Sequence, residues 1–182
     1  DALFAHGPLG GTFPTPPAGG TLVLVGGGVG IAPLYFYLRR FQGKARLVLF
    51  YGGRTAAELP LRDRLASAEG TDVRLVTEDG SHGERGLVTE PLERYLKQNA
   101  VDRIYCCGPN AMMAAVYRIG AAGGRPVWVS MENRMGCGMG VCLGCTMPVR
   151  DDRGIAMRRV CADGPVFEAD RVDWDTIGRS PI

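Results

Sequence analysis

The sequence predicts an α/β protein built on a doubly wound, five-stranded parallel sheet, followed by a small C-terminal module that is mainly β. Two observations carry this prediction. Between residues 21 and 130, short continuous apolar runs alternate with segments whose apolar residues recur at helical spacing, as in a parallel sheet covered by helices on both faces. After residue 130 the helical periodicity disappears, and glycines, cysteines and short strand-like runs take its place.

Each expected strand of the sheet is separated from the next by an expected helix. The strands are predicted at Thr21–Val25, Arg46–Tyr51, Asp72–Thr77, Arg103–Cys107 and Pro126–Ser130. The helices are predicted at Pro33–Phe41, Leu59–Ala68, Glu90–Gln98 and Ala111–Ala122. Pro33 stands in the first turn of its helix and Gly123–Gly124 follow the last one, which are the positions that these residue types prefer.

The C-terminal module is predicted to contain a β-hairpin. Thr146–Val149 and Ile155–Val160 flank a polar turn with two aspartates and a glycine, Arg150–Gly154. A module of this size buries little apolar core, and a bound metal would stabilise it. The predicted units are 1–20, a glycine- and proline-rich linker; 21–130, a nucleotide-binding domain; and 131–182, the small module.

Composition excludes several classes of protein. The net charge of +2 is too small to indicate a nucleic-acid or membrane-surface partner. No apolar stretch reaches the roughly 18 to 20 residues that span a bilayer, and no secretory signal is visible. Six cysteines without a sign of export indicate a reducing compartment, the cytoplasm, and metal or redox use.

Four of these cysteines have the spacing of a metal or cluster site. Cys137, Cys142, Cys145 and Cys161 follow the pattern C-x4-C-x2-C with a fifteen-residue gap before the last, which is the spacing of plant-type [2Fe–2S] ligation. Glycines 138, 140 and 144 lie between them and Gly136 directly precedes the first, where a loop wrapping a cluster needs positive φ and close approach. The pattern predicts a one-electron carrier. A structural zinc site, which usually takes two short cysteine pairs, and a set of disulfides remain open as alternatives.

A glycine-rich turn follows the first predicted strand, and it is typical of pyrophosphate binding at a helix N-terminus. The residues expected to bind the cofactor here are Gly26, Gly27, Gly28, Val29, Gly30 and Pro33. The match to G-x-G-x-x-G is incomplete, and the second strand does not end in an acidic residue. A purely structural turn is the open alternative.

Three further predicted strands end in polar or glycine-bearing turns. Because ligands bind at the carboxyl ends of strands in open α/β sheets, these turns add to the expected nucleotide site. The candidates are Gly52 and Arg54 after the second strand, Glu78 and Asp79 after the third, and Cys107, Gly108, Pro109 and Met112 after the fourth. Arg54 fits either a 2′-phosphate or a solvent-facing position, and Cys106 is expected to be a core thiol.

Together these motifs resemble the ferredoxin–NADP reductase superfamily. The turn Gly26–Pro33 is similar to its pyrophosphate-binding GGGxGxxP, and Cys107–Met112 to its CGPxxM, which lies near the nicotinamide. The cysteine run from Glu132 to Cys145, with Val160–Phe167, resembles the family of electron-transfer subunits of type B dihydroorotate dehydrogenase. The linker Gly7–Phe13 is similar to that family's passage between domains.

The resemblance implies that NADH delivers a hydride to FAD and that a [2Fe–2S] cluster passes single electrons to the FMN of a catalytic subunit that oxidises dihydroorotate for pyrimidine synthesis. It names no general acid or base, so no catalytic residue is expected. The family's FAD-binding barrel does not lie in this sequence, and the chain alone is expected to be inactive without it. The alternatives are a reductase subunit serving a hydrogenase or sulfide dehydrogenase, and a zinc-stabilised nucleotide-binding module without redox activity.

Overall fold

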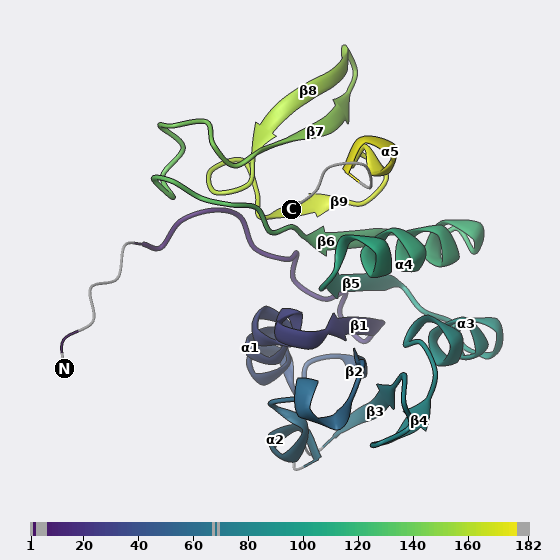
Figure 1. Ribbon diagram of the computed structural model, residues 1–182. Helices are drawn as coiled ribbons and strands as arrows, with labels where there is room; N and C mark the ends of the chain where they lie inside the picture. The colour runs from purple at the N-terminus through teal and green to yellow at the C-terminus, as the bar shows by residue number, and fades with distance from the viewer. Residues whose placement is uncertain (1, 3–6, 67, 69, 178–182) are drawn as a thin grey trace.

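A seven-stranded sheet forms the centre of the protein, with strand order β4-β3-β2-β1-β5-β6-β9, and β7 and β8 form a separate hairpin (Figure 1). The computed structural model describes residues 2, 7–66, 68 and 70–177. The strands are β1 Thr21–Gly27, β2 Arg46–Gly53, β3 Thr71–Thr77, β4 Glu84–Arg85, β5 Arg103–Cys107, β6 Val127–Ser130, β7 Thr146–Asp151, β8 Gly154–Arg159 and β9 Val166–Glu168. Within the large sheet every pair is parallel except β6 with β9.

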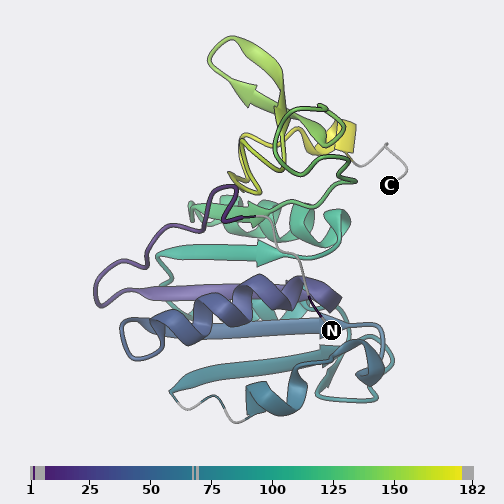
Figure 2. The same cartoon turned by 90° about the vertical axis from the view of Figure 1, so that its left-hand side faces the viewer.

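Helices cover both faces of the sheet, so the predicted doubly wound α/β class is confirmed. Helices α1 and α2 lie on one face, and α3 and α4 lie on the other (Figures 1 and 2). Their bounds are α1 Ile31–Phe41, α2 Arg62–Ala66, α3 Thr89–Gln98 and α4 Asn110–Ala122, with α5 Trp174–Ile177 near the C-terminus and short 3-10 turns η1 Gly28–Gly30 and η2 Ala56–Glu58. None of the helices in the described residues has the length and apolar character needed to span a membrane.

The continuous apolar run of β1 explains why it stands at the centre. Leu22 and Leu24 are buried among the side chains of the α1 face, whereas Val23 and Val25 are buried in the core cluster of the α3 and α4 face. All four side chains are fully buried. Because successive side chains point to opposite faces, a strand that is covered on both sides has to be apolar at every position.

All five predicted strands are present, and the differences are confined to short elements. The predicted helix Leu59–Ala68 is shorter and begins at Arg62. Leu59 precedes Pro60, which disfavours helical backbone, and Leu59 has φ −109° and ψ 65° at the end of η2. Strands β4 and β9 have two and three residues, too few to show a period in the sequence.

The C-terminal segment packs against the sheet and shares its hydrophobic core. Strand β9 pairs with β6, and the core cluster on the α4 face continues into the hairpin through Met147, Val149 and Val160. The division at residue 131 therefore remains a prediction. Residues 1 and 3–6 of the predicted linker and 178–182 of the predicted module lie outside the described residues.

The linker packs along the sheet before β1 begins. Phe13 is buried and stacks on Tyr105 of β5, with 4.8 Å between ring centroids. The Tyr105 and Tyr37 hydroxyls lie 3.0 and 2.7 Å from the Pro14 carbonyl oxygen. Because aromatic pairs and buried hydrogen bonds both stabilise a contact, these groups fix the path of the chain into β1.

Candidate functional site

The turn from β1 into α1 leaves open space above a glycine. Gly28 has φ +53°, and a Cβ added there would meet no atom within 4 Å. A backbone that is both left-handed and unobstructed is what a phosphate needs to approach the N–H groups at a helix N-terminus. The turn therefore fits the predicted pyrophosphate cradle.

This turn packs directly against the loop after β5. A Cβ on Gly30 would stand 2.3 Å from the Cys107 carbonyl oxygen, and one on Gly27 would stand 2.7 Å from Met112 Sδ. The two predicted cofactor motifs are thus in contact, and their glycines have a packing reason as well as a ligand-binding one. The structure brings together Gly26, Gly27, Gly28, Val29, Gly30 and Pro33 with Cys107, Gly108, Pro109 and Met112.

Two helices begin at this edge of the sheet. Neither α1 nor α4 has a side-chain cap hydrogen bond at its N-cap residue, Gly30 or Pro109, and neither carries an acidic residue in its first turn. The positive end of each helix dipole is therefore not opposed by an acidic side chain and is available to an anion. A dinucleotide pyrophosphate is an anion of the right kind.

On the other side of β1, the end of β2 is tied to the same turn. The Tyr51 hydroxyl lies 3.1 Å from the Gly28 carbonyl oxygen and 3.4 Å from that of Glu58. Gly52 lies opposite Gly27 in the register, and a Cβ on it would stand 2.7 Å from Val88 Cβ. Burial raises the pKa of Tyr51 to about 12, so this hydroxyl stays protonated at neutral pH.

Arg54, the candidate for a 2′-phosphate, is already held by a carboxylate. Its Nε donates to Glu58 Oε1 at 2.8 Å, its Nη2 lies 2.6 Å from the same oxygen, and its backbone N–H donates to Oε2 at 3.1 Å. The hydrogen bonds and the charge of Glu58 raise the pKa of Arg54, and Arg54 lowers the pKa of Glu58. The guanidinium is therefore neutralised by its own neighbour four residues along the chain.

Glu78 and Asp79 follow β3 and complete this side of the edge. Their backbone N–H groups donate to the carbonyls of Gly53 and Arg54 at 3.1 and 3.2 Å. Asp79 Oδ1 accepts from the Ser81 hydroxyl and N–H at 2.6 and 2.9 Å, and these bonds lower its pKa. Asp79 therefore orders the loop.

The thiols of β5 are not reactive groups. Burial raises the pKa of Cys107 to about 11, against a hydrogen bond with Ser130 that lowers it. Cys106 is fully buried, and its pKa lies well above the ordinary value for the same reason. The prediction that Cys106 is a core thiol is confirmed, and Cys107 presents a neutral thiol at the edge of the sheet.

The hairpin explains the fifteen-residue gap between the last two cysteines. Cys145 immediately precedes β7, and Cys161 follows β8 after one residue. Because Thr146 pairs with Arg159, the two cysteines meet at the open end of the hairpin, with 3.2 Å between their sulfur atoms. Both are buried, whereas Cys142 is exposed and Cys137 is partly exposed.

Backbone N–H groups point at the cysteine sulfurs. Cys137 Sγ accepts from Val141 and Cys142 at 3.3 and 3.4 Å. Cys142 Sγ accepts from Gly144, and Cys145 Sγ from Cys161, both at 3.4 Å. The backbone N–H of Cys142 is the first cause that lowers the pKa of Cys137 to about 6. Donors of this kind stabilise thiolates, the form that binds iron or zinc.

The four sulfurs form two pairs. Cys145 and Cys161 are one pair, and Cys137 and Cys142 are hydrogen-bonded to each other as the second. Across the described parts of the chain, no three Cys, His, Asp or Glu side chains converge on a point that could hold one metal ion. Two pairs of cysteines supply two donors for each of the two irons of a [2Fe–2S] cluster, so the donor set fits that cluster.

The loop glycines do not all serve the predicted purpose. Gly138 and Gly140 have φ values of +70° and +85°, as expected, but Gly136 and Gly144 do not have positive φ. At those two positions a Cβ would lie 3.2 and 3.5 Å from Cys142 Sγ, so glycine keeps room beside the sulfur. The positive φ in this part of the loop falls on Leu143, with φ +59°.

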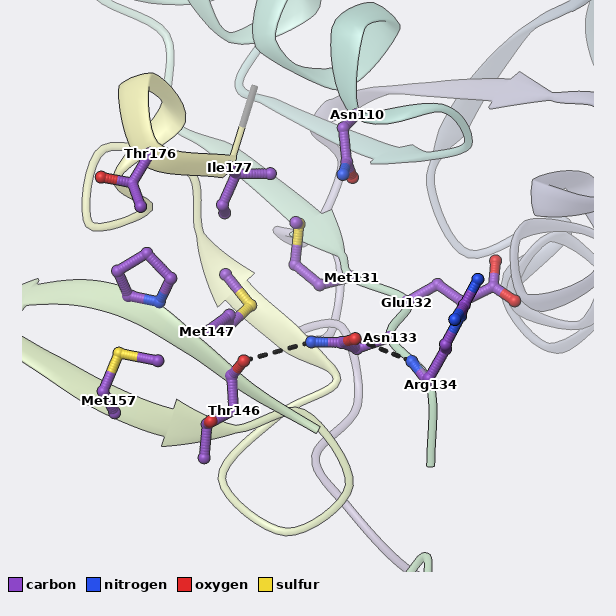
Figure 3. A pocket seen from close by; sticks show the side chains of 11 residues that line it. Asn110, Met131, Glu132, Asn133, Arg134, Thr146, Met147, Met157, Thr176 and Ile177 are labelled. Atoms are coloured by element: carbon purple, nitrogen blue, oxygen red, sulfur yellow. Dashed lines mark hydrogen bonds between the residues drawn. The ribbon is translucent and has the colours of Figure 1, made fainter. Parts of the chain in front are cut away.

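A pocket of about 260 Å³ lies between the nucleotide edge and the cysteine loop. Asn110, the first residue of α4, and Met131 project toward it, and Thr146 beside Cys145 forms the opposite wall (Figure 3). Asn133 Nδ2 donates to the Thr146 carbonyl at 3.2 Å, and its Oδ1 accepts from the Arg134 N–H at 2.7 Å. These bonds fix the segment that leads into the cysteine loop.

Some site residues were not found by sequence reasoning. Four residues make prominent contacts in the structure although no ligand-type motif marks them in the sequence: Glu58, Tyr51, Arg159 and Asp163. The only signal was a four-residue spacing of opposite charges, Arg54 to Glu58 and Arg159 to Asp163.

Family comparisons agree with this geometry. Residues 132–173 match the family described as the iron-sulfur cluster binding domain of dihydroorotate dehydrogenase B. Residues 24–118 match the oxidoreductase NAD-binding domain. The first match contains all four cysteines, and the second contains the glycine turn after β1 and the loop after β5.

Whole-chain comparisons give the same result. The chain is 38% identical over 94% of its length to the dihydroorotate dehydrogenase B (NAD(+)) electron transfer subunit of Caldanaerobacter subterraneus, 38% over 94% to that of Bacillus caldolyticus and 34% over 96% to that of Desulforamulus reducens. It spans 66%, 65% and 67% of the length of these three relatives.

Solved structures of similar fold include two reductases. An NADH-dependent reduced ferredoxin-NADP oxidoreductase, studied for flavin-based electron bifurcation, aligns with a TM-score of 0.80 at 30% identity and covers 96% of this chain and 61% of its own. An Amycolatopsis cytochrome P450 reductase aligns with a TM-score of 0.54 at 28% identity and covers 64% of this chain and 39% of its own. From its motifs, its fold and these relatives, the chain belongs to the family of dihydroorotate dehydrogenase B electron-transfer subunits.

Proposed function

We propose that this chain carries electrons between a nicotinamide nucleotide and the FMN of a dihydroorotate-oxidising catalytic subunit, by way of a [2Fe–2S] cluster held by Cys137, Cys142, Cys145 and Cys161. The observation that carries the proposal is the arrangement of the cysteines in two pairs, with backbone N–H groups directed at their sulfurs. Asn110, at the nucleotide edge, and Thr146, next to Cys145, line one pocket, so the two sites stand on neighbouring elements.

The protein's part in this chemistry is binding and orientation. When bound, the flavin accepts a hydride from the nicotinamide, and the iron–sulfur cluster relays single electrons. The glycine turn and the two helix N-termini would hold the pyrophosphate, and Cys107–Met112 would face the nicotinamide. The N–H groups directed at the sulfurs would stabilise the reduced, more negative cluster.

The nucleotide side favours NADH over NADPH. An arginine at this position can bind a 2′-phosphate, but Glu58 occupies Arg54 through three contacts. The carboxylates of Glu78 and Asp79 follow the neighbouring strand, and a 2′-phosphate placed there meets negative charge. The name of the relatives, which includes NAD(+), supports the same choice.

The proposal includes two features that membership of the family does not by itself establish. The first is the FMN of the partner subunit, which follows from the electron-transfer subunit family and from the resemblance of the cysteine run. The second is the dependence of this chain on an FAD-binding unit for NADH oxidation. Both are open to direct tests with purified components.

The test uses dihydroorotate as the electron source. Cluster-loaded chain is mixed anaerobically with an FMN-containing dihydroorotate dehydrogenase subunit, dihydroorotate is added, and the visible absorption of the cluster is followed. Bleaching that requires both the subunit and dihydroorotate is the expected result. A loaded chain that stays oxidised with this partner, but is reduced by reduced ferredoxin and its reductase, would instead favour the other-acceptor function, in line with the ferredoxin-dependent structural neighbour.

A further inference from the structure

Arg159, at the end of β8, connects the two loops that carry the cysteines. Its Nε and Nη2 donate to the two carboxylate oxygens of Asp163 at 3.0 and 2.9 Å. Its Nη1 donates to the Gly140 carbonyl at 3.1 Å. One guanidinium therefore bonds both to the turn that contains Cys161 and to the loop between Cys137 and Cys142.

The turn around Cys161 is itself built on Arg159. The Arg159 N–H donates to Asp163 Oδ2 at 2.8 Å, and the Arg159 carbonyl accepts from the N–H groups of Asp163 and Gly164 at 2.8 and 3.2 Å. The cysteine loop rests on this turn at Gly140, where a Cβ would stand 2.8 Å from Ala162 Cβ. The planar guanidinium of arginine has N–H donors in fixed directions and can therefore bind two partners at once. The single ammonium group of lysine does this less well.

The same guanidinium neutralises a carboxylate beside the sulfurs. Its partner Asp163, at 2.9 Å, stands two residues after Cys161. The Arg159 side chain is 37% exposed and the Asp163 side chain 26%, so solvent screens this interaction only in part. The potential of an iron–sulfur cluster depends on the charge and the hydrogen bonds around its sulfurs.

We propose that Arg159 is a positioning residue of the cluster site, which clamps the Cys137–Cys142 loop to the Cys161 turn and, by neutralising the Asp163 carboxylate beside the sulfurs, keeps the reduction potential of the cluster higher than it would be without it. This inference rests on the cluster assignment of the proposed function. The clamp and the charge effect can be separated by substitution. Lysine keeps the positive charge but lacks the several fixed donors of the guanidinium, whereas glutamine lacks both.

The experiment compares Arg159→Gln and Arg159→Lys with the parent chain. The measurements are the rate of iron release to a chelator, followed by visible absorption, and the midpoint potential from an anaerobic redox titration. We expect both variants to release iron several-fold faster. We expect the potential to shift to more negative values in Arg159→Gln and to stay near the parent value in Arg159→Lys.

Arg158→Gln is the matched control. Arg158 stands next to Arg159 on β8 and pairs with Asp151 at 3.0 Å, in the hairpin and not in the cysteine loop. Its iron release should equal that of the parent. If Arg159→Gln does not accumulate a cluster, the clamp is tested by the rate of iron release from Arg159→Lys.

The outcomes separate this inference from the proposed function. A parent chain without iron and sulfide overturns the proposed function itself. A loaded parent whose iron release is unchanged in both Arg159 variants overturns the clamp. An unchanged potential in Arg159→Gln overturns the charge effect.

Discussion

The backbone N–H of Gly11 donates to the carbonyl of Gly164 at 2.5 Å, which joins the linker to the turn that follows Cys161. The next residue of that turn, Pro165, accepts from the Met131 N–H at 2.8 Å, at the point where β6 ends. The linker, the nucleotide sheet and the cysteine module therefore meet at one short turn. The position of Cys161 depends on all three.

This contact predicts that Gly10→Ala destabilises the protein. Gly10 has φ +76°, and a Cβ there would stand 2.7 Å from the Gly164 carbonyl oxygen. The clash and the backbone strain together should lower the free energy of unfolding by about 2 kcal/mol, measured by denaturant titration. Gly19→Ala is the control, because Gly19 has φ +68° but open space around it. An equal loss in both variants would mean that strain alone acts and the turn contact contributes nothing.

The glycine turn predicts a selective effect on nucleotide binding. Gly28→Val should weaken NADH affinity at least tenfold, because the branched side chain would fill the open approach above the turn. Fluorescence titration with NADH gives the dissociation constant. Gly43→Val is the control for strain, since Gly43 has φ +77° and equally open space in the turn after α1. Unchanged NADH affinity in Gly28→Val would refute the binding turn.

The Arg54–Glu58 pair predicts a change in nucleotide preference. Glu58→Ala should free Arg54 for a 2′-phosphate and tighten NADPH binding roughly tenfold, with little change for NADH. The measurement is the ratio of the two dissociation constants. Glu93→Ala removes a comparable surface pair with Lys97 on α3 and should leave the ratio as it is. A ratio that stays constant in Glu58→Ala would show that Arg54 does not face the ribose.

The buried hydroxyl of Tyr51 predicts a loss of stability at alkaline pH. Burial raises the pKa of Tyr51 from 10 to about 12, so the folded state retains a proton that the unfolded state releases above pH 10. The contribution of the neutral Tyr51 hydroxyl to the free energy of unfolding is therefore fully present below pH 10 and is lost as the pH rises toward 12. A shift of two pKa units sets an upper bound of about 3 kcal/mol on this loss. Unfolding free energies measured from pH 8 to pH 11.5 should fall less steeply in Tyr51→Phe. Parallel curves for the two proteins would contradict the assignment to Tyr51.

The sequence was sufficient for the parts of the structure that depend on periodicity. Each strand of the parallel sheet is a continuous apolar run, and burial of β1 on both faces requires that pattern. The hairpin was readable from the polar residues of its turn. These features are local, so they can be recognised without knowledge of distant contacts.

The features that sequence reasoning missed depend on contacts between distant segments. Strand β9 exists because Val166–Glu168 meets the free edge of β6, and three residues carry no period of their own. The sequence suggested a free cation at Arg54, whereas in the structure Glu58 of η2 is hydrogen-bonded to it. Gly136 and Gly144 were expected to have positive φ, whereas their role is to leave room beside Cys142 Sγ. Tertiary packing decided each of these.

The account depends most on the identity of the group that the four cysteines hold. Cys142→Ser should remove most of the bound iron, because one of the four sulfurs is lost. Cys107→Ala, at the nucleotide edge, should leave the iron content unchanged. A full iron content with a normal visible spectrum in Cys142→Ser would sink the ligand assignment.

The most direct test is a count of iron, acid-labile sulfide and zinc in the anaerobically purified chain, each relative to protein. The account predicts about two irons and two sulfides per chain, with no stoichiometric zinc. Stoichiometric zinc without sulfide would contradict it and would make the C-terminal segment a structural zinc module that transfers no electrons.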